Sequence, residues 1–408
     1  MPSIPSRVRR MALTALVAML ASVCLCADTG ETLFELLQAT ASQKPAFAKQ
    51  QANDTSRITG GLCVQLGSSD LGFVLEAART GRFLVHVLDA DPSAVARARQ
   101  HLQEQSLYGL VSVDRASSAR PLPYADNLVN VLVVEPNTGL TIPPAEIARV
   151  VSPNGLVIIP ESSAGAIRAA GLQGIQSVDA GGRRLVARKP WPTDMDSWTH
   201  PRHASDGNAV SADTLVGPPR GVQWVAGPPR EINYMVSSAG RNFYAGLLAR
   251  DSFNGLRLWQ KSLGNSTATY GAELGLARGK ARPVAACELV FALHGGKLVA
   301  IDGATGETVR EYPDAGVPAD MLHTNGILLA LDKQSVRALQ SESGRLMWTC
   351  EATEPRYMVA GDDAVYLLQS RPRRGETVEL TSLDLTTGSV RWGQTDYPWM
   401  PGVRRLVY

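Results

Sequence analysis

The stretch Leu380-Thr381-Ser382-Leu383-Asp384-Leu385-Thr386-Thr387-Gly388 alternates apolar and polar residues, turns between Asp384 and Gly388, and is followed by Trp392. The alternation predicts a strand with one buried face, and the Asp-x-x-x-Gly segment predicts a turn into a second strand. Similar stretches reach their turn at Gly255, Gly306 and Gly344, so that the four glycines are 51, 38 and 44 residues apart. This spacing is typical of the four-stranded blades of a propeller.

In three of these stretches an indole follows four residues after the turn glycine, as Trp259, Trp348 and Trp392, whereas Arg310 holds that place in the second stretch. A single blade cannot bury both faces of its sheet, so we expect these tryptophans to pack against neighbouring blades. Residues 236–408 are therefore predicted to be propeller blades. Four signatures are too few for the closed rings of this repeat class, and the sequence favours a fragment of a longer protein over a ring that a partner completes.

The first 27 residues have the pattern of a secretory signal peptide. Arg7, Arg9 and Arg10 precede an uncharged apolar run over residues 11–21, and small residues follow up to Ala27. The alternative is a membrane anchor, but the apolar run is short for a full span. We expect an exported protein of the periplasm or cell envelope with no membrane span after cleavage, in which residues 28–60 form a helical or linker segment.

Composition excludes some classes of function. The chain has 408 residues, 44% of them hydrophobic, which is enough for two or more domains with sizeable cores. Lys and Arg total 40 against 38 Asp and Glu, and this balance predicts no nucleic-acid partner. After cleavage only Cys63, Cys287 and Cys350 remain, far apart and odd in number, so core packing is expected for each rather than a disulfide framework.

Residues 61–189 alternate between apolar strands and amphipathic helices. Strands are predicted at residues 62–66, 83–88, 129–134 and 156–159, and Asp91-Pro92 is a predicted helix start. A turn at 152–155 is expected to precede the strand at 156–159, and a hairpin is expected to close the region. This order predicts an α/β doubly wound parallel sheet with an antiparallel edge.

Ligands of such sheets lie at the carboxyl ends of the strands. Gly67-Ser68-Ser69-Asp70-Leu71-Gly72 follows the first strand, where glycine permits close approach of the backbone to a ligand. Asp89 ends the second strand, where a carboxylate can accept hydrogen bonds from both hydroxyls of a ribose. Asp89 also has a purely structural alternative, since it could cap the end of its strand.

The region resembles the class I S-adenosylmethionine-dependent methyltransferases. The resemblance rests on residues 67–72 as the glycine-rich motif, 88–92 after the second strand, Leu122-Pro123-Tyr124-Ala125-Asp126, and 146–156, similar to Glu-x-x-Arg-Val-Leu-x-Pro-Gly-Gly. It implies a Rossmann-like fold, with Gly67, Ser69, Asp89 and Glu135 around the cofactor. Three departures fall on the ligand side. Gly67-Ser68-Ser69 replaces Gly-x-Gly, Asp114-Arg115-Ala116 matches only loosely the Asp-Ala pair that the resemblance implies near the adenine, and Asn130 replaces the usual acid of the fourth strand.

Residues 190–235 are predicted to be a junction that includes the first propeller strand. Prolines and Trp191 and Trp198 interrupt the alternating pattern, and Gly-Pro-Pro segments bracket Val222-Gln223-Trp224-Val225, the predicted strand. The whole chain is similar to exported bacterial proteins that join a methyltransferase-like domain to a PQQ-like (quinoprotein dehydrogenase-type) propeller.

That resemblance raises the question of a pyrroloquinoline quinone cofactor. Quinoprotein dehydrogenases use a calcium ion in the central channel and a disulfide between adjacent cysteines, and this chain has no adjacent cysteine pair. His200 and His203 have no further residues at the spacing of a metal site, so no metal ligands are predicted. The quinone is therefore disfavoured, and S-adenosylmethionine is the cofactor to test.

Three hypotheses for function follow from these patterns. The first is an exported scaffold without catalytic residues, whose propeller binds a protein or polysaccharide and whose methyltransferase-like domain is degenerate. The second is an S-adenosylmethionine-dependent methyltransferase. The third is a quinoprotein oxidoreductase.

Overall fold

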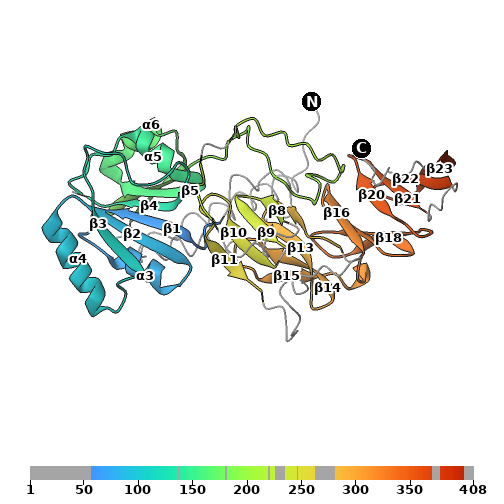
Figure 1. Cartoon of the computed structure of the whole chain (residues 1–408), viewed down its shortest axis with the longest axis horizontal. Helices are drawn as coiled ribbons and strands as arrows, with labels where there is room; N and C mark the ends of the chain where they lie inside the picture. The colour runs from blue at the N-terminus through green and yellow to red at the C-terminus, as the bar shows by residue number, and fades with distance from the viewer. Residues whose placement is uncertain are drawn as a thin grey trace, which may run out of the picture.

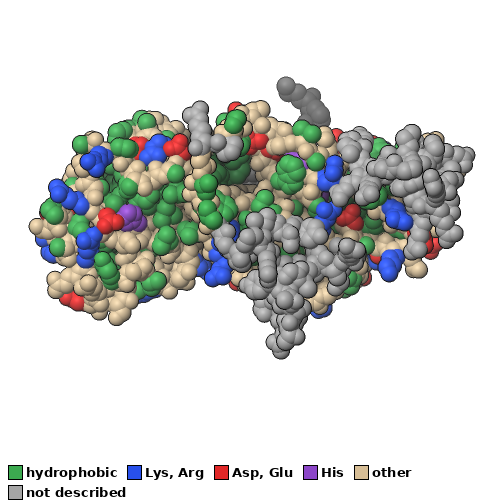
Figure 2. Space-filling model, viewed as in Figure 1, with side chains coloured by type: hydrophobic (Ala, Val, Ile, Leu, Met, Phe, Trp, Pro, Cys, Tyr) green, Lys and Arg blue, Asp and Glu red, His purple; other side chains and the backbone are tan. Residues whose placement is uncertain are grey.

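The computed structural model describes residues 57–136, 138–179, 182–218, 221–225, 235–245, 247–261, 281–369 and 377–398. The predicted signal peptide and nearly all of the segment 28–60 lie outside the described residues. Figure 1 shows an α/β domain at one end of the molecule, followed by a row of small β-sheets. On the face shown in Figure 2, basic and acidic side chains are interspersed over both parts.

The first domain contains one seven-stranded sheet in the order β3-β2-β1-β4-β5-β7-β6. β1 to β5 are parallel, and β7 is antiparallel to both β5 and β6. The α/β doubly wound prediction is thus confirmed. The strands are β1 Gly61–Leu66, β2 Phe83–Asp89, β3 Val111–Arg115, β4 Val129–Val134, β5 Val151–Pro160, β6 Gln173–Asp179 and β7 Arg183–Arg188.

The helices are α3 Gly72–Arg79, α4 Pro92–Glu104, α5 Pro144–Val150 and α6 Ala164–Ala169, with the short 3-10 helix η1 at Glu161–Ser163. Asp91 caps α4 as predicted, because its carboxylate accepts hydrogen bonds from Ser93 N and Ala94 N. One expectation was wrong: residues 152–155 do not separate a helix from a later strand. β5 already begins at Val151 and absorbs these residues in a register shift against β4.

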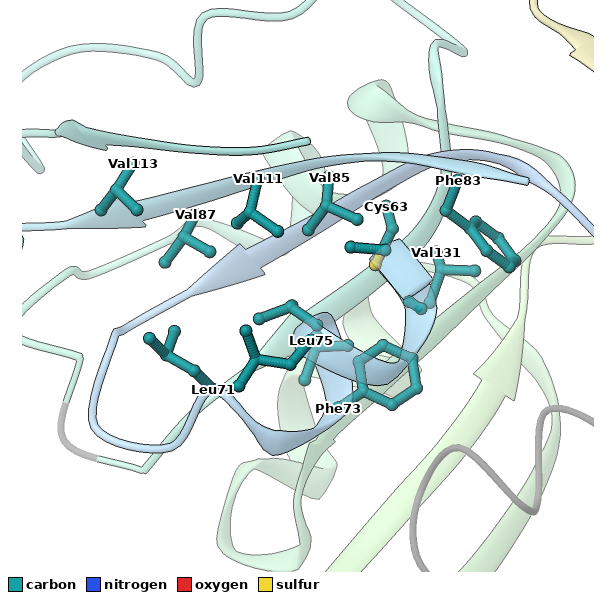
Figure 3. Packing of buried hydrophobic residues seen from close by; sticks show 14 of the residues in the cluster. Cys63, Leu71, Phe73, Leu75, Phe83, Val85, Val87, Val111, Val113 and Val131 are labelled. Carbon is teal, nitrogen blue, oxygen red and sulfur yellow. The ribbon is translucent and has the colours of Figure 1, made fainter. Parts of the chain in front are cut away.

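Two apolar clusters cover the two faces of this sheet. In the first, Figure 3 shows Cys63, Val85 and Val131 of the central strands facing Phe73 and Leu75 of α3. The second cluster joins the other face to α5 and α6. Cys63 is fully buried, and burial raises the pKa of its thiol to about 12, so its predicted role in core packing is confirmed.

The second part consists of four antiparallel sheets of four strands, each formed by consecutive strands. Their first strands, β8, β12, β16 and β20, contact one another in series and therefore form the inner layer. The sheets stand in a row without closing a ring (Figure 1). Their strands are β8 Met235–Ser238, β9 Arg241–Tyr244, β10 Leu248–Asp251, β11 Arg257–Gln260; β12 Val284–Ala286, β13 Leu289–His294, β14 Lys297–Asp302, β15 Thr308–Glu311; β16 Asp320–Thr324, β17 Ile327–Leu331, β18 Ser335–Gln340, β19 Leu346–Glu351; β20 Tyr357–Ala360, β21 Ala364–Gln369, β22 Thr377–Asp384 and β23 Val390–Pro398. Another 3-10 helix, η3, spans Pro313–Ala315.

Indoles join successive blades as the sequence predicted. Trp259 and Trp348 are buried, and each lies on the turn glycine of the next blade. A Cβ at Gly306 would lie 2.7 Å from the ring of Trp259, and one at Gly388 would lie 2.5 Å from the ring of Trp348. Each indole Nε1–H also donates to the carbonyl three residues before that glycine, at 2.8 and 2.9 Å. Glycine is therefore required at both turns, where φ is also positive.

The blade without an indole makes the same contact with two other side chains. Arg310 lies against Gly344, and its Nη1 donates to Ser343 O at 2.9 Å. The hydroxyl of the buried Tyr312 donates to Ser341 O, which is again three residues before the turn glycine. Tyr312 thus supplies the donor, and the stem of Arg310 supplies the apolar cover.

Two expectations about tryptophans were wrong. Trp392 is 46% exposed rather than buried, because no described blade follows its own. Residues 222–225 are not a strand, and the first propeller strand is β8. Trp224 instead docks on Gly255 as a blade tryptophan would, with Nε1 donating to Ser252 O at 3.2 Å.

Candidate functional site

The loop after β1 packs tightly against the residues that follow β4. Gly67 has φ of +94°, and a Cβ there would lie 2.9 Å from Cβ of Glu135 and 3.2 Å from the methyl group of Thr138. Nε2 of Gln65 donates to the carbonyls of Gly67 and Asp70, which fixes the loop in this position. The glycine therefore permits close packing within the protein at the point where the resemblance places the cofactor.

Asp89 lies at the end of β2, beside this loop, and is 7% exposed. Its Oδ2 accepts hydrogen bonds from Ser68 N at 2.8 Å and Ser68 Oγ at 2.6 Å, and its Oδ1 accepts one from Asp91 N at 2.9 Å. A carboxylate offers about four acceptor positions. Three of these are filled from within the chain, so the carboxylate lacks the two free acceptors that a ribose diol needs.

Glu135 is also occupied by a protein partner. Its Oε2 lies 2.9 Å from Nη2 of Arg184 on β7, and both side chains are only 5% exposed. Burial raises the pKa of Glu135, while the contact with Arg184 opposes that shift. The structure thus brings Gly67, Asp89 and Glu135 together at the carboxyl ends of the strands, whereas Ser69 is exposed.

Asn130, the departure on the fourth strand, belongs to a buried contact between the two domains. Its Oδ1 accepts from Leu62 N at 2.8 Å and from Asn254 Nδ2 at 2.6 Å, and its Nδ2 donates to Asp251 Oδ2 at 2.8 Å. An amide can donate to Asp251, whereas the usual acid would set two carboxylates against each other. The departure therefore fits the propeller rather than a cofactor.

A buried ion cluster lies at the same boundary. Arg57 pairs with Glu288 at 3.3 Å and with Asp302 at 2.6 Å, and all three side chains are at most 5% exposed. The backbone N–H of Arg57 also donates to Glu288, and Arg241 donates to the carbonyl of Arg57. This cluster could not be predicted from the sequence, because Arg57 lies more than 200 residues from its two acidic partners.

Residues 198–205, which we call the axial strap, bind the first strand of each of the four described blades. The carbonyls of Trp198, Thr199 and Ser205 accept from β8, β12 and β20 at 2.7, 2.8 and 2.9 Å. Nε2 of His200 accepts from His323 N on β16 at 3.1 Å. The junction therefore runs along the inner side of the blades. His203 pairs with Asp196 at 2.6 Å, so both histidines of the strap have protein partners.

The strap separates two clefts. The basic cleft, about 210 Å³, lies where β12, β16 and β20 begin, and its lining includes Arg202, Arg282, Asp320, Arg356 and Tyr357. The histidine cleft, about 320 Å³, lies where β8, β12 and β16 end, and its lining includes Asp196, His203, Cys287, His323 and Asn325. His200 contributes to both. Within the described residues, no cluster of three or more His, Cys, Asp or Glu side chains has the geometry of a metal site.

His200 makes the stability of the propeller sensitive to acid. Burial, and then the nearby His323, lower the pKa of His200 from 6.5 to about 3. The unfolded chain therefore binds a proton below pH 6.5 that the folded chain rejects, so stability is lost as the pH falls from 6.5 towards 3. We expect this residue to lower the free energy of unfolding by about 2 kcal/mol at pH 5. Urea titrations at pH 7 and pH 5 measure this loss of stability. His200→Gln keeps a hydrogen-bond acceptor and should reduce the difference in unfolding free energy between the two pH values. An unchanged pH dependence in that variant would contradict the assignment to His200.

The described fold defines a two-domain protein in which an α/β domain with a doubly wound sheet precedes a row of four-stranded antiparallel sheets. Residues 235–397 match the family model PQQ_2, described as outer membrane protein assembly factor BamB. No curated protein sequence matches the chain. Among the described residues, no helix has the length and apolar character needed to cross a bilayer.

Solved structures are similar to parts of the chain. A candidate sarcosine dimethylglycine methyltransferase from Galdieria sulphuraria is 20% identical over 25% of this chain and 40% of its own, with a TM-score of 0.23. BamB from Moraxella catarrhalis is 20% identical over 41% of this chain and 47% of its own, with a TM-score of 0.26. The chain thus spans less than half the length of both. A methyltransferase from Geobacter sulfurreducens is 16% identical over 47% of this chain and 99% of its own, with a TM-score of 0.28.

Proposed function

We propose that this protein is a binding scaffold without catalytic activity, in which the propeller carries the binding surface and the α/β domain is a structural support. The observation that carries the proposal is the occupation of Asp89 by Ser68 and Asp91. A carboxylate that is already bound within the chain cannot hold the ribose of S-adenosylmethionine without breaking those bonds. The packing of Gly67 against Glu135 supports the same conclusion.

The proposed location is the periplasm or cell envelope, and the proposed partner is a protein or a polysaccharide reached through the propeller. The signal-peptide pattern of residues 1–27 supports export. The matched family is named for an assembly factor of outer membrane proteins, which supports a protein partner. The near-balanced charge of +2 argues against nucleic acid.

A methyltransferase is the second candidate, because Gly67, Asp89 and Glu135 do converge at the strand ends. A quinoprotein is the third. The axial strap argues against it, since it runs along the inner strands, where the resemblance places the quinone. Calcium-dependent uptake of quinone by the whole chain would favour this third function.

Calorimetric titration of the full chain with S-adenosylmethionine tests the proposal. We expect no heat of binding, which corresponds to a Kd above about 1 mM. Micromolar binding that is lost in Asp89→Ala, and kept in the control Glu104→Ala on the exposed side of α4, would instead establish the methyltransferase site. If binding occurs but Asp89→Ala leaves it unchanged, both the scaffold and this site assignment are wrong.

A further inference from the structure

The basic cleft gathers positive charge from separate parts of the chain. Arg202 comes from the axial strap, Arg282 precedes β12, and Arg356 precedes β20. Among the described residues that line the cleft, Asp320 is the acidic one. Arginines thus outnumber acidic residues among the described lining of this opening, although the chain as a whole is nearly neutral.

Arg356 and Arg202 are placed to meet a ligand at the surface. Arg356 is exposed, and Arg202 and Arg282 are half-buried. Nε of Arg202 donates to Gly207 O at 2.8 Å, which orients its guanidinium group. His200 adds no charge at neutral pH, since burial keeps it unprotonated. Guanidinium groups suit carboxylates in particular, because their paired N–H donors match the two carboxylate oxygens.

The walls of the cleft suit a chain-like ligand rather than an isolated ion. Tyr357 is half-buried, and Leu322 and Met358 provide apolar surface behind it. The neighbouring inner strands already bind one extended segment through its main chain, namely the axial strap, whose carbonyls accept from Ala285 N and Ala360 N. The strap thus shows that an extended main chain fits against these strands.

We propose that the basic cleft binds an extended, acidic peptide segment of a partner protein, with carboxylates at the arginines and the apolar stems of its side chains against Tyr357. This inference rests on the proposed binding function and names its ligand class. The peptide is favoured over an anionic polysaccharide because the strap shows that these strands accept a polypeptide main chain.

Fluorescence anisotropy with the full chain and a labelled octaglutamate peptide tests the inference, with the octaglutamine peptide as the uncharged reference. We expect octaglutamate to bind and octaglutamine not to bind. Arg356→Glu should weaken binding about tenfold, because it removes a favourable contact and adds a repulsion. Arg345→Glu makes the same change of charge at an exposed turn outside the cleft and should leave binding unchanged.

Circular dichroism and melting temperature verify that both variants are folded, and Arg356→Gln, which only removes the charge, should have a smaller effect in the same direction. Equal weakening by Arg356→Glu and Arg345→Glu would mean unspecific attraction and overturn the inference. Binding of polygalacturonate, but not of octaglutamate, with the same dependence on Arg356 would overturn it in favour of a polysaccharide. If the folded chain binds neither S-adenosylmethionine nor octaglutamate, the scaffold proposal stands and this inference fails.

Discussion

Trp348→Ala is expected to lower the free energy of unfolding by about 3–5 kcal/mol, as for other large aromatic side chains removed from a core. The indole is 8% exposed, lies on the turn glycine of the following blade and donates to Leu385 O at 2.9 Å. Its removal opens a cavity between two blades and leaves a buried carbonyl without its donor. Urea denaturation followed by circular dichroism measures the loss.

Trp392→Ala is the matched control, because Trp392 has the same place in its blade but is 46% exposed. Trp392→Ala should lower the free energy of unfolding by about 1 kcal/mol or less, as for other partly exposed positions. A similar loss in both variants would show that the indole stabilises its own blade rather than the joint between blades. A small loss of stability in Trp348→Ala would contradict the conclusion that the indole joins the two blades.

The joints between blades show what the sequence could and could not predict. The blade turns, and the packing of Trp259 and Trp348 against neighbouring blades, could be predicted because both depend on local spacing. The replacement of the indole by Arg310 and Tyr312 could not be predicted, because it depends on where these two side chains contact the neighbouring blade. The prediction for residues 222–225 was wrong because their sequence is typical of a strand, whereas tertiary contacts with the first blade and with the α/β domain hold them instead of strand pairing.

The candidate site, too, could be predicted only in part. The positions of Gly67 and Asp89 at the strand ends followed from the alternating pattern, and the structure brings them together. The sequence did not predict the hydrogen bonds from Ser68 and Asp91 to the carboxylate of Asp89, because a serine in a loop can equally face solvent. The substitution of Asn130 was visible in the sequence, but its partner Asp251 lies 121 residues away. A departure from a family pattern can thus mark a contact between domains as well as a loss of chemistry.

The second large effect concerns the boundary between the domains. Glu288→Ala is expected to lower the free energy of unfolding by about 3–5 kcal/mol, because it leaves a buried charge without one of its partners. Glu288 is 2% exposed and accepts from both the backbone N–H and the side chain of Arg57, so the truncation breaks two contacts at once. Differential scanning calorimetry of Glu288→Ala should also resolve separate unfolding transitions for the two domains, because the variant breaks the cluster that couples them.

Glu311→Ala is the control for a lost ion pair on the surface. Glu311 lies 2.8 Å from Lys297, but the two side chains are 54% and 64% exposed, so its removal should change stability by about 1 kcal/mol or less. Glu288→Gln keeps an acceptor for Arg57 and should be intermediate. If Glu288→Ala has no greater effect than Glu311→Ala, the buried cluster does not stabilise the boundary, and the α/β domain would have to be regarded as a separate unit rather than a support for the propeller.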